Sequence, residues 1–188
     1  MLHVLRGEYA AATAIYDAVA ERLAEGGATD GEAMAVVGSM VVGFARGDLS
    51  AAVPALTELY GRLQTSIADV LVLGLLDAGR EQEARRIWRS ENAVIRDYYW
   101  LAFSTMRGWA AVRLGDRTVA ARSYADLLPF AGRIAGLGSG SAAFGPVDAA
   151  LAALADLLDR PEAATEHRAG AERVDARVRE QLELLATG

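Results

Sequence analysis

The sequence predicts an all-α protein, a right-handed superhelix of about nine helices arranged as antiparallel pairs. The composition is dominated by alanine, leucine, arginine and glutamate, which favour helix. A pattern also recurs, in which a glycine is followed by an alanine five residues later and a large residue nine residues later. Such self-similarity indicates a stacked helical array rather than one catalytic core. Four copies and a worn fifth follow one another: Gly7, Ala12 and Tyr16; Gly47, Ala52 and Leu56; Gly79, Ala84 and Trp88; Gly115, Ala120 and Tyr124; Asp159, Ala164 and Arg168.

Each position of the pattern has a physical role in a helix–turn–helix unit. The glycine permits the left-handed conformation that ends the first helix. Asp48 or Ser50, and Asp116 or Thr118, can then cap the second helix. The alanine lets two helix axes approach closely, and the large residue one turn later fills the space between them.

The turn positions follow one another at 40, 32, 36 and 44 residues, around the period of about 34 that is typical of two-helix repeats. The variation falls in the connections. One is a polar loop at 26–31, and a longer one at 132–145 has alternating glycines at Gly136, Gly138 and Gly140. These loops are therefore expected to join neighbouring helix pairs.

In chain order, the apolar periodicity predicts one lone helix followed by four pairs. Pro54 and Pro161 fall in the first turn of their helices, where proline is tolerated. The last helix carries an apolar stripe of Val174, Val178, Leu182 and Leu185, which favours a capping helix over the end of the stack. The predicted ranges are 9–24; 32–46 and 50–63; 66–78 and 81–91; 96–114 and 118–130; 146–158 and 162–185.

The first copy has almost no first helix, because only residues 1–6 precede its glycine. The lone helix 9–24 would then leave one apolar face uncovered. We therefore expect residues 1–188 to form a single helical-repeat domain that is a fragment of a longer chain. A homodimer through the N-terminal end is the alternative solution.

Composition excludes several functional classes. All 19 cations are arginine and alternate with acids, and the net charge is −6, so direct binding to nucleic acid is not expected. The chain has no cysteine, which excludes disulfides and thiolate chemistry. Its longest apolar stretches are too short to span a bilayer and its N-terminus lacks a signal-peptide core, so we expect a cytoplasmic protein without membrane contact.

No constellation of residues predicts catalysis, a cofactor or a metal. His3 and His167 are the only histidines and the chain has no cysteine, so no metal site is expected. The glycines at 136–145 could suggest a phosphate cradle, but no predicted strand precedes them and the chain has no lysine, so a connection between repeats is the better interpretation. Asp69 and Asp77 would lie about 12 Å apart on one helix, too far for joint acid–base work. The protein is therefore expected not to be an enzyme.

The copies resemble tetratricopeptide repeats. The fourth copy matches this family best, with a small residue in its first helix, a Gly-Asp turn and the family's alanine, aromatic and proline in its second helix. The third copy lacks the aromatic residue two positions after its glycine, and the fifth has lost both glycine and aromatic. The matching residues of the fourth copy are Gly108, Leu114, Gly115, Asp116, Ala120, Tyr124, Leu127 and Pro129.

In tetratricopeptide arrays the first helices of the pairs line a concave groove, and the resemblance implies such a groove here. It would be apolar with a few charges, and an exposed apolar concavity normally marks a partner site. Trp109 and Arg113 are the expected anchors, because these residue types are enriched at binding hot spots. The residues at the matching groove positions are Val37, Val41, Phe44, Asp69, Leu73, Asp77, Thr105, Trp109 and Arg113.

A narrower resemblance covers residues 126–174. The runs 127–133, 144–147 and 157–164, followed by His167 and Ala171, look like the C-terminal repeats of large bacterial ATP-binding transcriptional regulators of the LuxR and antibiotic-regulatory type. This resemblance implies a sensor or scaffold segment. The chain has no Walker A sequence and no clear basic recognition helix, so the ATPase and DNA-binding parts would lie elsewhere.

These observations together predict a non-catalytic protein–protein interaction or regulatory domain of a bacterial transcriptional regulator. Its partner would be a protein or peptide, including other domains of the same chain. The alternative is a small-molecule sensor, because eight of the 13 aromatic residues fall between 88 and 130 and could close around an inducer. Core packing between repeats is the simpler interpretation for Trp88, Phe103 and Tyr124.

Overall fold

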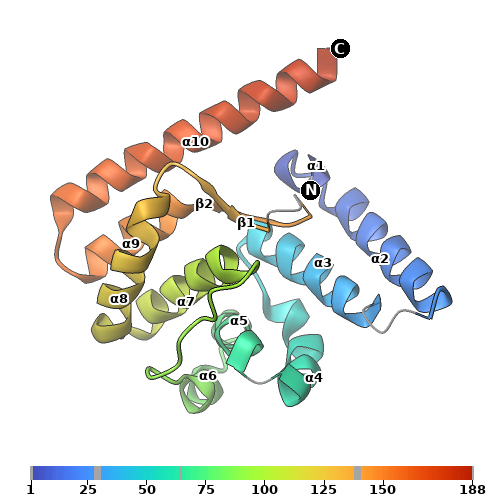
Figure 1. Cartoon of the computed structure of the whole chain (residues 1–188), viewed down its shortest axis with the longest axis horizontal. Coiled ribbons are helices and arrows are strands. Elements are labelled where there is room, and N and C mark those ends of the chain that lie inside the picture. The colour runs from blue at the N-terminus through green and yellow to red at the C-terminus, as the bar shows by residue number, and fades with distance from the viewer. Residues whose placement is uncertain (1, 28–30, 64, 138–140, 188) are drawn as a thin grey trace.

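The computed structural model describes residues 2–27, 31–63, 65–137 and 141–187, and this part of the chain is mostly helical (Figure 1). It contains ten α-helices, two short 3₁₀ turns and two short strands, which confirms the predicted helical class. The elements are α1 (Leu2–Leu5), α2 (Tyr9–Glu25), α3 (Gly31–Arg46), η1 (Ser50–Ala52), α4 (Val53–Leu63), α5 (Thr65–Asp77), α6 (Glu81–Ile87), α7 (Trp100–Leu114), α8 (Arg117–Leu127), η2 (Leu128–Phe130), β1 (Ile134–Gly136), β2 (Ala143–Pro146), α9 (Val147–Leu157) and α10 (Pro161–Thr187).

The same turn ends the first helix of every copy of the repeat. The residues at the turn positions have positive φ angles of 75°, 73°, 71°, 72° and 57° at Gly7, Gly47, Gly79, Gly115 and Asp159. At each turn this residue's N–H donates to the carbonyl three residues earlier, and the next N–H donates to the carbonyl five residues before it, at 2.8–3.2 Å. This pair of bonds is the Schellman motif, and it confirms the predicted left-handed turn at the four glycines and extends it to Asp159.

Replacing Gly115 by alanine is expected to lower the free energy of unfolding by roughly 1–2 kcal/mol, because an L-residue is strained in the left-handed region. A Cβ at this position would meet no atom within 4 Å, so the loss of stability would come from backbone strain and not from a steric clash. Gly61→Ala is the matched control. Gly61 lies inside α4 and its added Cβ also meets nothing, so this change should stabilise by roughly 0.5–1 kcal/mol in a urea titration. Equal effects of the two changes would contradict the account of the turn.

The alanines and large residues of the repeat lie in the core, with one exception. The five alanines at 12, 52, 84, 120 and 164 are at most 4% exposed. Tyr16, Leu56 and Tyr124 are buried and Trp88 is half-buried. Arg168 of the fifth copy is exposed, and its buried neighbour His167 contacts Tyr124 instead. The worn copy therefore keeps the turn and the alanine but fills the inter-helix space with a different side chain.

Neighbouring helices pack on one another along the chain. α2 packs on α3, α4 on α5, α5 on α6 and α7, α7 on α8 and α9, and α9 on α10. Figure 1 shows α2 and α3 at one end of the molecule and α8 and α9 at the other, with α10 running back toward the N-terminal helices. Of the described helices, none combines the length and the apolar character needed to cross a membrane.

The predicted stripe of the last helix is covered only in part. Val174 is 3% exposed where α10 packs on α9, and Val178 and Leu182 are half-buried. Leu185 is 63% exposed, so the helix covers the end of the array with its first part only. At the other end, α1 packs on α2 and α3 through the buried Val4, which partly fills the place of the missing first helix.

The glycine-rich connection folds into a hairpin, which the sequence did not predict. β1 and β2 pair antiparallel, β2 contacts α3 and β1 contacts α7. Phe144 on β2 lies edge-on against Phe44 of α3, with ring centroids 5.7 Å apart. A Cβ on Gly136 would lie 2.5 Å from the carbonyl oxygen of Ala142, so glycine is required there. Gly138 and Gly140 lie outside the described residues.

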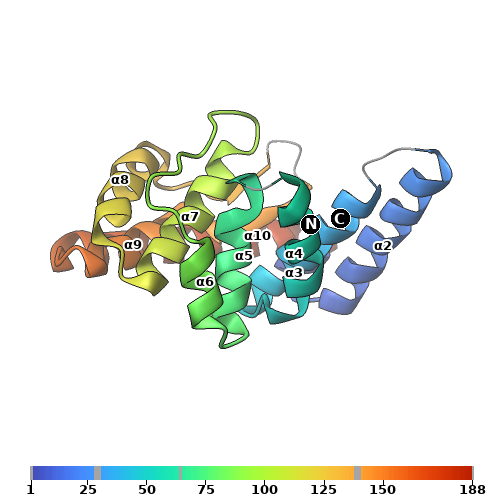
Figure 2. The ribbon, with the colours of Figure 1, turned by 90° about the horizontal axis from the view of Figure 1, so that it is seen from below.

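The connection between α6 and α7 is longer than predicted. α6 ends at Ile87 rather than at 91, and α7 begins at Trp100 rather than at 96. Residues 88–99, which we call the cover segment, form the long loop beside α7 in Figure 2. The backbone carbonyls of Arg89 and Ser90 accept hydrogen bonds from the Arg107 side chain. In a continued helix they would accept from backbone N–H groups four residues later, so these bonds explain the early end of α6.

Candidate functional site

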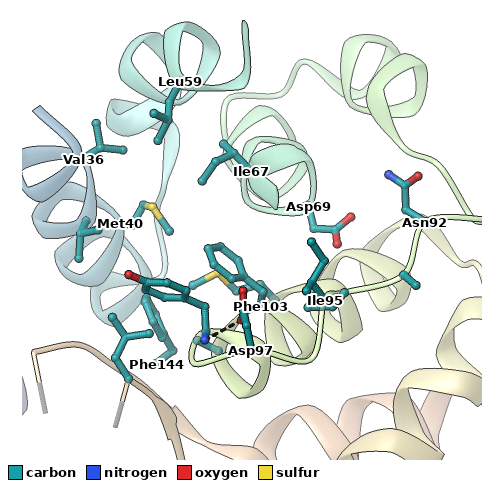
Figure 3. Close-up of a pocket in the computed structure, with 17 residues that line it drawn as sticks. Val36, Met40, Leu59, Ile67, Asp69, Asn92, Ile95, Asp97, Phe103 and Phe144 are labelled. Carbon is teal, nitrogen blue, oxygen red and sulfur yellow. Dashed lines mark hydrogen bonds between the residues drawn. The ribbon is translucent and has the colours of Figure 1, made fainter. Parts of the chain in front are cut away.

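An apolar cavity of about 360 Å³ lies between α3, α5 and α7. The cover segment and the hairpin of β1 and β2 complete its wall. Figure 3 shows Val36 and Met40 on one side of this space, with Asp69 and Asn92 on the opposite side. The described residues that line it are Val36, Val37, Met40, Leu59, Ile67, Asp69, Asn92, Ala93, Val94, Ile95, Asp97, Tyr99, Ala102, Phe103, Met106, Leu137 and Phe144.

Helical periodicity places the apolar side chains in the cavity wall. Val36 and Met40 are four residues apart on α3, and Phe103 and Met106 are three apart on α7, so each pair shares one face of its helix. Ile67 adds a side chain from the first turns of α5. Three helices, α3, α5 and α7, thus each contribute apolar side chains to the wall of the same cavity.

The cover segment is held in place by Asp116, the turn residue of the fourth copy. Asp116 Oδ2 accepts hydrogen bonds from Trp88 Nε1 at 2.9 Å and from Ser90 Oγ at 2.6 Å. Its Oδ1 caps α8 by accepting from the Val119 N–H at 3.0 Å, as the sequence predicted for this residue. Burial would raise the pKa of Asp116, but the hydrogen bonds led by the one from Ser90 lower it below its usual value. The carboxylate therefore joins the repeat turn to the cavity wall.

A buried ion pair forms the boundary of the cavity. Arg107 Nη1 donates to Asp69 Oδ1 at 3.0 Å and to Oδ2 at 3.2 Å, and both side chains are at most 10% exposed. Arg107 Nη2 donates to the carbonyls of Arg89 and Ser90 at 3.0 and 3.2 Å, and its guanidinium lies 4.8 Å from the centre of the Trp88 ring. Burial raises the pKa of Asp69, and the charge and hydrogen bonds of Arg107 oppose that rise.

A polar cavity of about 230 Å³ lies on the other side of residues 92–94. Ser104 and Ser123 line it together with Arg107 and Arg122. Asn92, Ala93 and Val94 line both spaces, so this short stretch and the Asp69–Arg107 pair separate an apolar space from a polar one.

The structure brings only two of the nine predicted groove residues, Val37 and Asp69, to the cavity. Val41, Leu73 and Thr105 are at most 3% exposed and belong to the core, so they do not form an open surface. Their burial corrects the expectation of one continuous groove: the hairpin packs on α3 and α7, and Phe144 contacts the predicted groove residue Phe44.

The remaining predicted residues lie elsewhere on the helices. Asp77 pairs with Arg113 and also accepts the Leu49 N–H at 2.7 Å, so it ties α5 to its neighbours. Arg113 is exposed and Trp109 is half-buried. Asp69 and Asp77 thus belong to two separate ion pairs, with Arg107 and with Arg113. This agrees with the expectation that the two carboxylates do not act together.

Sequence reasoning missed Arg107, the cover segment and the hairpin. Arg107 lies 38 residues from Asp69, and nothing in the repeat pattern marks either as a partner of the other. The available signal for the cover segment was its aromatic content at Trp88, Tyr98 and Tyr99.

His167 takes part in a buried polar network with Tyr124 and Asp148. Its Nε2 lies 3.0 Å from the Tyr124 hydroxyl and its Nδ1 lies 3.0 Å from Asp148 Oδ1. Asp148 Oδ2 also accepts the Gly132 N–H, so the network joins α8, α9 and α10 to the base of the hairpin. Among the described residues, no group of three or more His, Cys, Asp or Glu side chains is placed to hold a metal ion.

Searches against protein-family models, curated proteins and solved structures found no match to this chain.

Proposed function

We propose that this chain is a non-catalytic helical-repeat domain that binds a small, largely apolar molecule in the cavity between α3, α5 and α7. The observation that carries this proposal is the cavity itself. Its volume of about 360 Å³ falls within the range of roughly 300–1,000 Å³ that is usual for ligand sites. Its wall is mainly aliphatic and aromatic with a few polar groups, which is the composition such sites have.

The recurring turn supports the proposal that the array is a tetratricopeptide-like superhelix. Five Schellman turns and five buried alanines at the same repeat positions are what stacked, nearly equivalent helix pairs require. Together with the resemblance at 126–174, this architecture supports a regulatory domain of a bacterial transcriptional regulator that acts in the cytoplasm. The bound molecule would then be its inducer.

Protein binding is a second candidate, favoured by the outer face of the cover segment. Ile95 is 66% exposed, Tyr98 53% and Tyr99 46%, and tyrosine is enriched at binding hot spots. Tyr99 and Ile95 also line the cavity, so one segment meets both the ligand space and the solvent. A partner that contacts this segment would sense whether the cavity is filled.

Thermal unfolding in the presence of a panel of small apolar and aromatic compounds tests the proposed function. A compound at 100 times its dissociation constant should stabilise the protein by about 2.7 kcal/mol, because it binds the folded state alone. The expected result is a concentration-dependent rise in the unfolding midpoint with a subset of the panel. Unchanged midpoints across the whole panel would contradict ligand binding and leave protein binding as the better proposal.

A further inference from the structure

The charged side chains that line the apolar cavity, among the described residues, are both carboxylates. Two carboxylates, Asp69 and Asp97, and the amide of Asn92 line it, whereas no described lining residue is an arginine or a histidine. Arg107 reaches Asp69 from the side of the polar cavity. A ligand in the apolar cavity therefore meets negative charge, and no described lining side chain is a cation that could receive an anionic group.

Asp97 keeps its charge available at the rim of this cavity. Its Oδ1 accepts the Tyr99 N–H at 2.8 Å, the bond drawn as a dashed line in Figure 3. Its Oδ2 has no hydrogen-bond partner among the described residues, and the neighbouring Arg96 pairs with Asp126 instead. Asp69, in contrast, is neutralised by Arg107. The uncompensated negative charge at the cavity is thus that of Asp97.

Aromatic rings add a second feature that favours positive charge. Phe103 and Phe144 line the cavity beside Tyr99, and the faces of aromatic rings attract cations at distances of about 6 Å or less. The apolar part of a ligand would contact Met40 and Ile67, which lie on α3 and α5 across the same space.

We infer that the cavity selects an apolar or aromatic amine, with the hydrocarbon part among Met40, Ile67 and Phe103 and the ammonium group at the Asp97 carboxylate. This inference rests on the proposed function, since it names the class of molecule that the same cavity takes. It also predicts that carboxylates of the same shape are rejected, because they would face Asp97 with no cation beside it.

Three probes with one skeleton separate charge from shape: 2-naphthylmethylamine, 2-naphthalenemethanol and 2-naphthoate. Titration calorimetry on the whole chain at neutral pH should give the tightest binding for the amine, weaker binding for the alcohol and the weakest for the carboxylate. We expect the dissociation constant of the amine to be lower than that of the alcohol by about fivefold or more. This factor corresponds to the attraction between two unit charges about 4 Å apart in a water-like medium.

Asp97→Asn is the matched variant, because the amide oxygen of asparagine can still accept the Tyr99 N–H while the charge is lost. It should abolish the preference for the amine and leave the affinity for the alcohol within about twofold. Asp175→Asn, which removes an exposed carboxylate on α10, is the control for the net charge of the chain and should preserve the preference.

The outcomes separate the inference from the proposed function. If the alcohol binds but the amine is not preferred, or if Asp97→Asn keeps the preference, the inference is wrong and the proposed function stands. If none of the three probes binds at millimolar concentration, the proposed function itself is contradicted. A preference that disappears equally in Asp175→Asn would show that the overall charge, not the cavity, selects the amine.

Discussion

Replacement of Asp69 by alanine is expected to lower the free energy of unfolding by about 3–5 kcal/mol, among the largest effects of any single change in this chain. The change would leave the Arg107 guanidinium buried without its carboxylate, and an uncompensated buried charge is strongly destabilising. Arg107 also holds the carbonyls of Arg89 and Ser90, so its displacement should loosen the cover segment. Urea titration followed by circular dichroism measures the loss.

Two further variants separate this charge effect from a simple loss of side-chain contacts. The double variant Asp69→Leu with Arg107→Met replaces the pair by apolar groups and should recover much of the stability lost in Asp69→Ala. Asp156→Ala removes the acid of an ion pair with Arg168 in which both side chains are at least half exposed, and should cost less than about 1 kcal/mol. An Asp69→Ala loss no larger than that of Asp156→Ala would refute the structural role given to the buried pair.

Val37→Trp is expected to weaken ligand binding by at least about tenfold, or about 1.4 kcal/mol. Val37 is half-buried on α3 and lines the cavity, so an indole at this position would occupy the space that the ligand needs. The variant should stay folded, since the added atoms enter an empty space rather than a packed core. Calorimetry with the tightest-binding compound measures the loss, and circular dichroism checks the fold.

Ile15→Trp is the matched control for this change. Ile15 is 50% exposed on α2 and does not line the cavity, so the same indole there should leave the affinity unchanged. Equal affinities of Val37→Trp and the parent protein would mean that the ligand binds elsewhere on the molecule.

Features that depend on local backbone chemistry were predictable from the sequence. The left-handed turns follow from glycine at four positions, and even Asp159 adopts a φ of 57° because aspartate tolerates this region better than most residues. The cap at Asp116 and the buried alanines also follow from positions within one repeat. Asp48 accepts the Ser50 N–H ahead of η1, but it is not the N-cap of that turn or of α4. These features were enough to predict most helix boundaries.

The cavity was not predictable, because it depends on contacts between residues far apart in the sequence. Arg107 draws the cover segment away from a helical path by taking its carbonyls, and the partner that orients Arg107 is Asp69, 38 residues earlier. The hairpin strands are only three and four residues long and carry one strand-favouring residue each, Ile134 and Phe144, among alanine, glycine and proline, so their pattern indicated only a loop. Three of the predicted groove residues, Val41, Leu73 and Thr105, are buried in the core instead, and the cavity lies between the helices, the cover segment and the hairpin.

The central claim is that a small molecule binds in the cavity between α3, α5 and α7. The most direct test follows the methionine methyl signals by NMR while a compound that binds the protein is added. The chain has four methionines, of which Met40 and Met106 line the cavity, whereas Met34 on α3 does not. We predict that the methyl signals of Met40 and Met106 shift together along one binding curve while that of Met34 stays in place. Saturable binding that leaves the signals of Met40 and Met106 unmoved would contradict the assignment of this cavity as the ligand site.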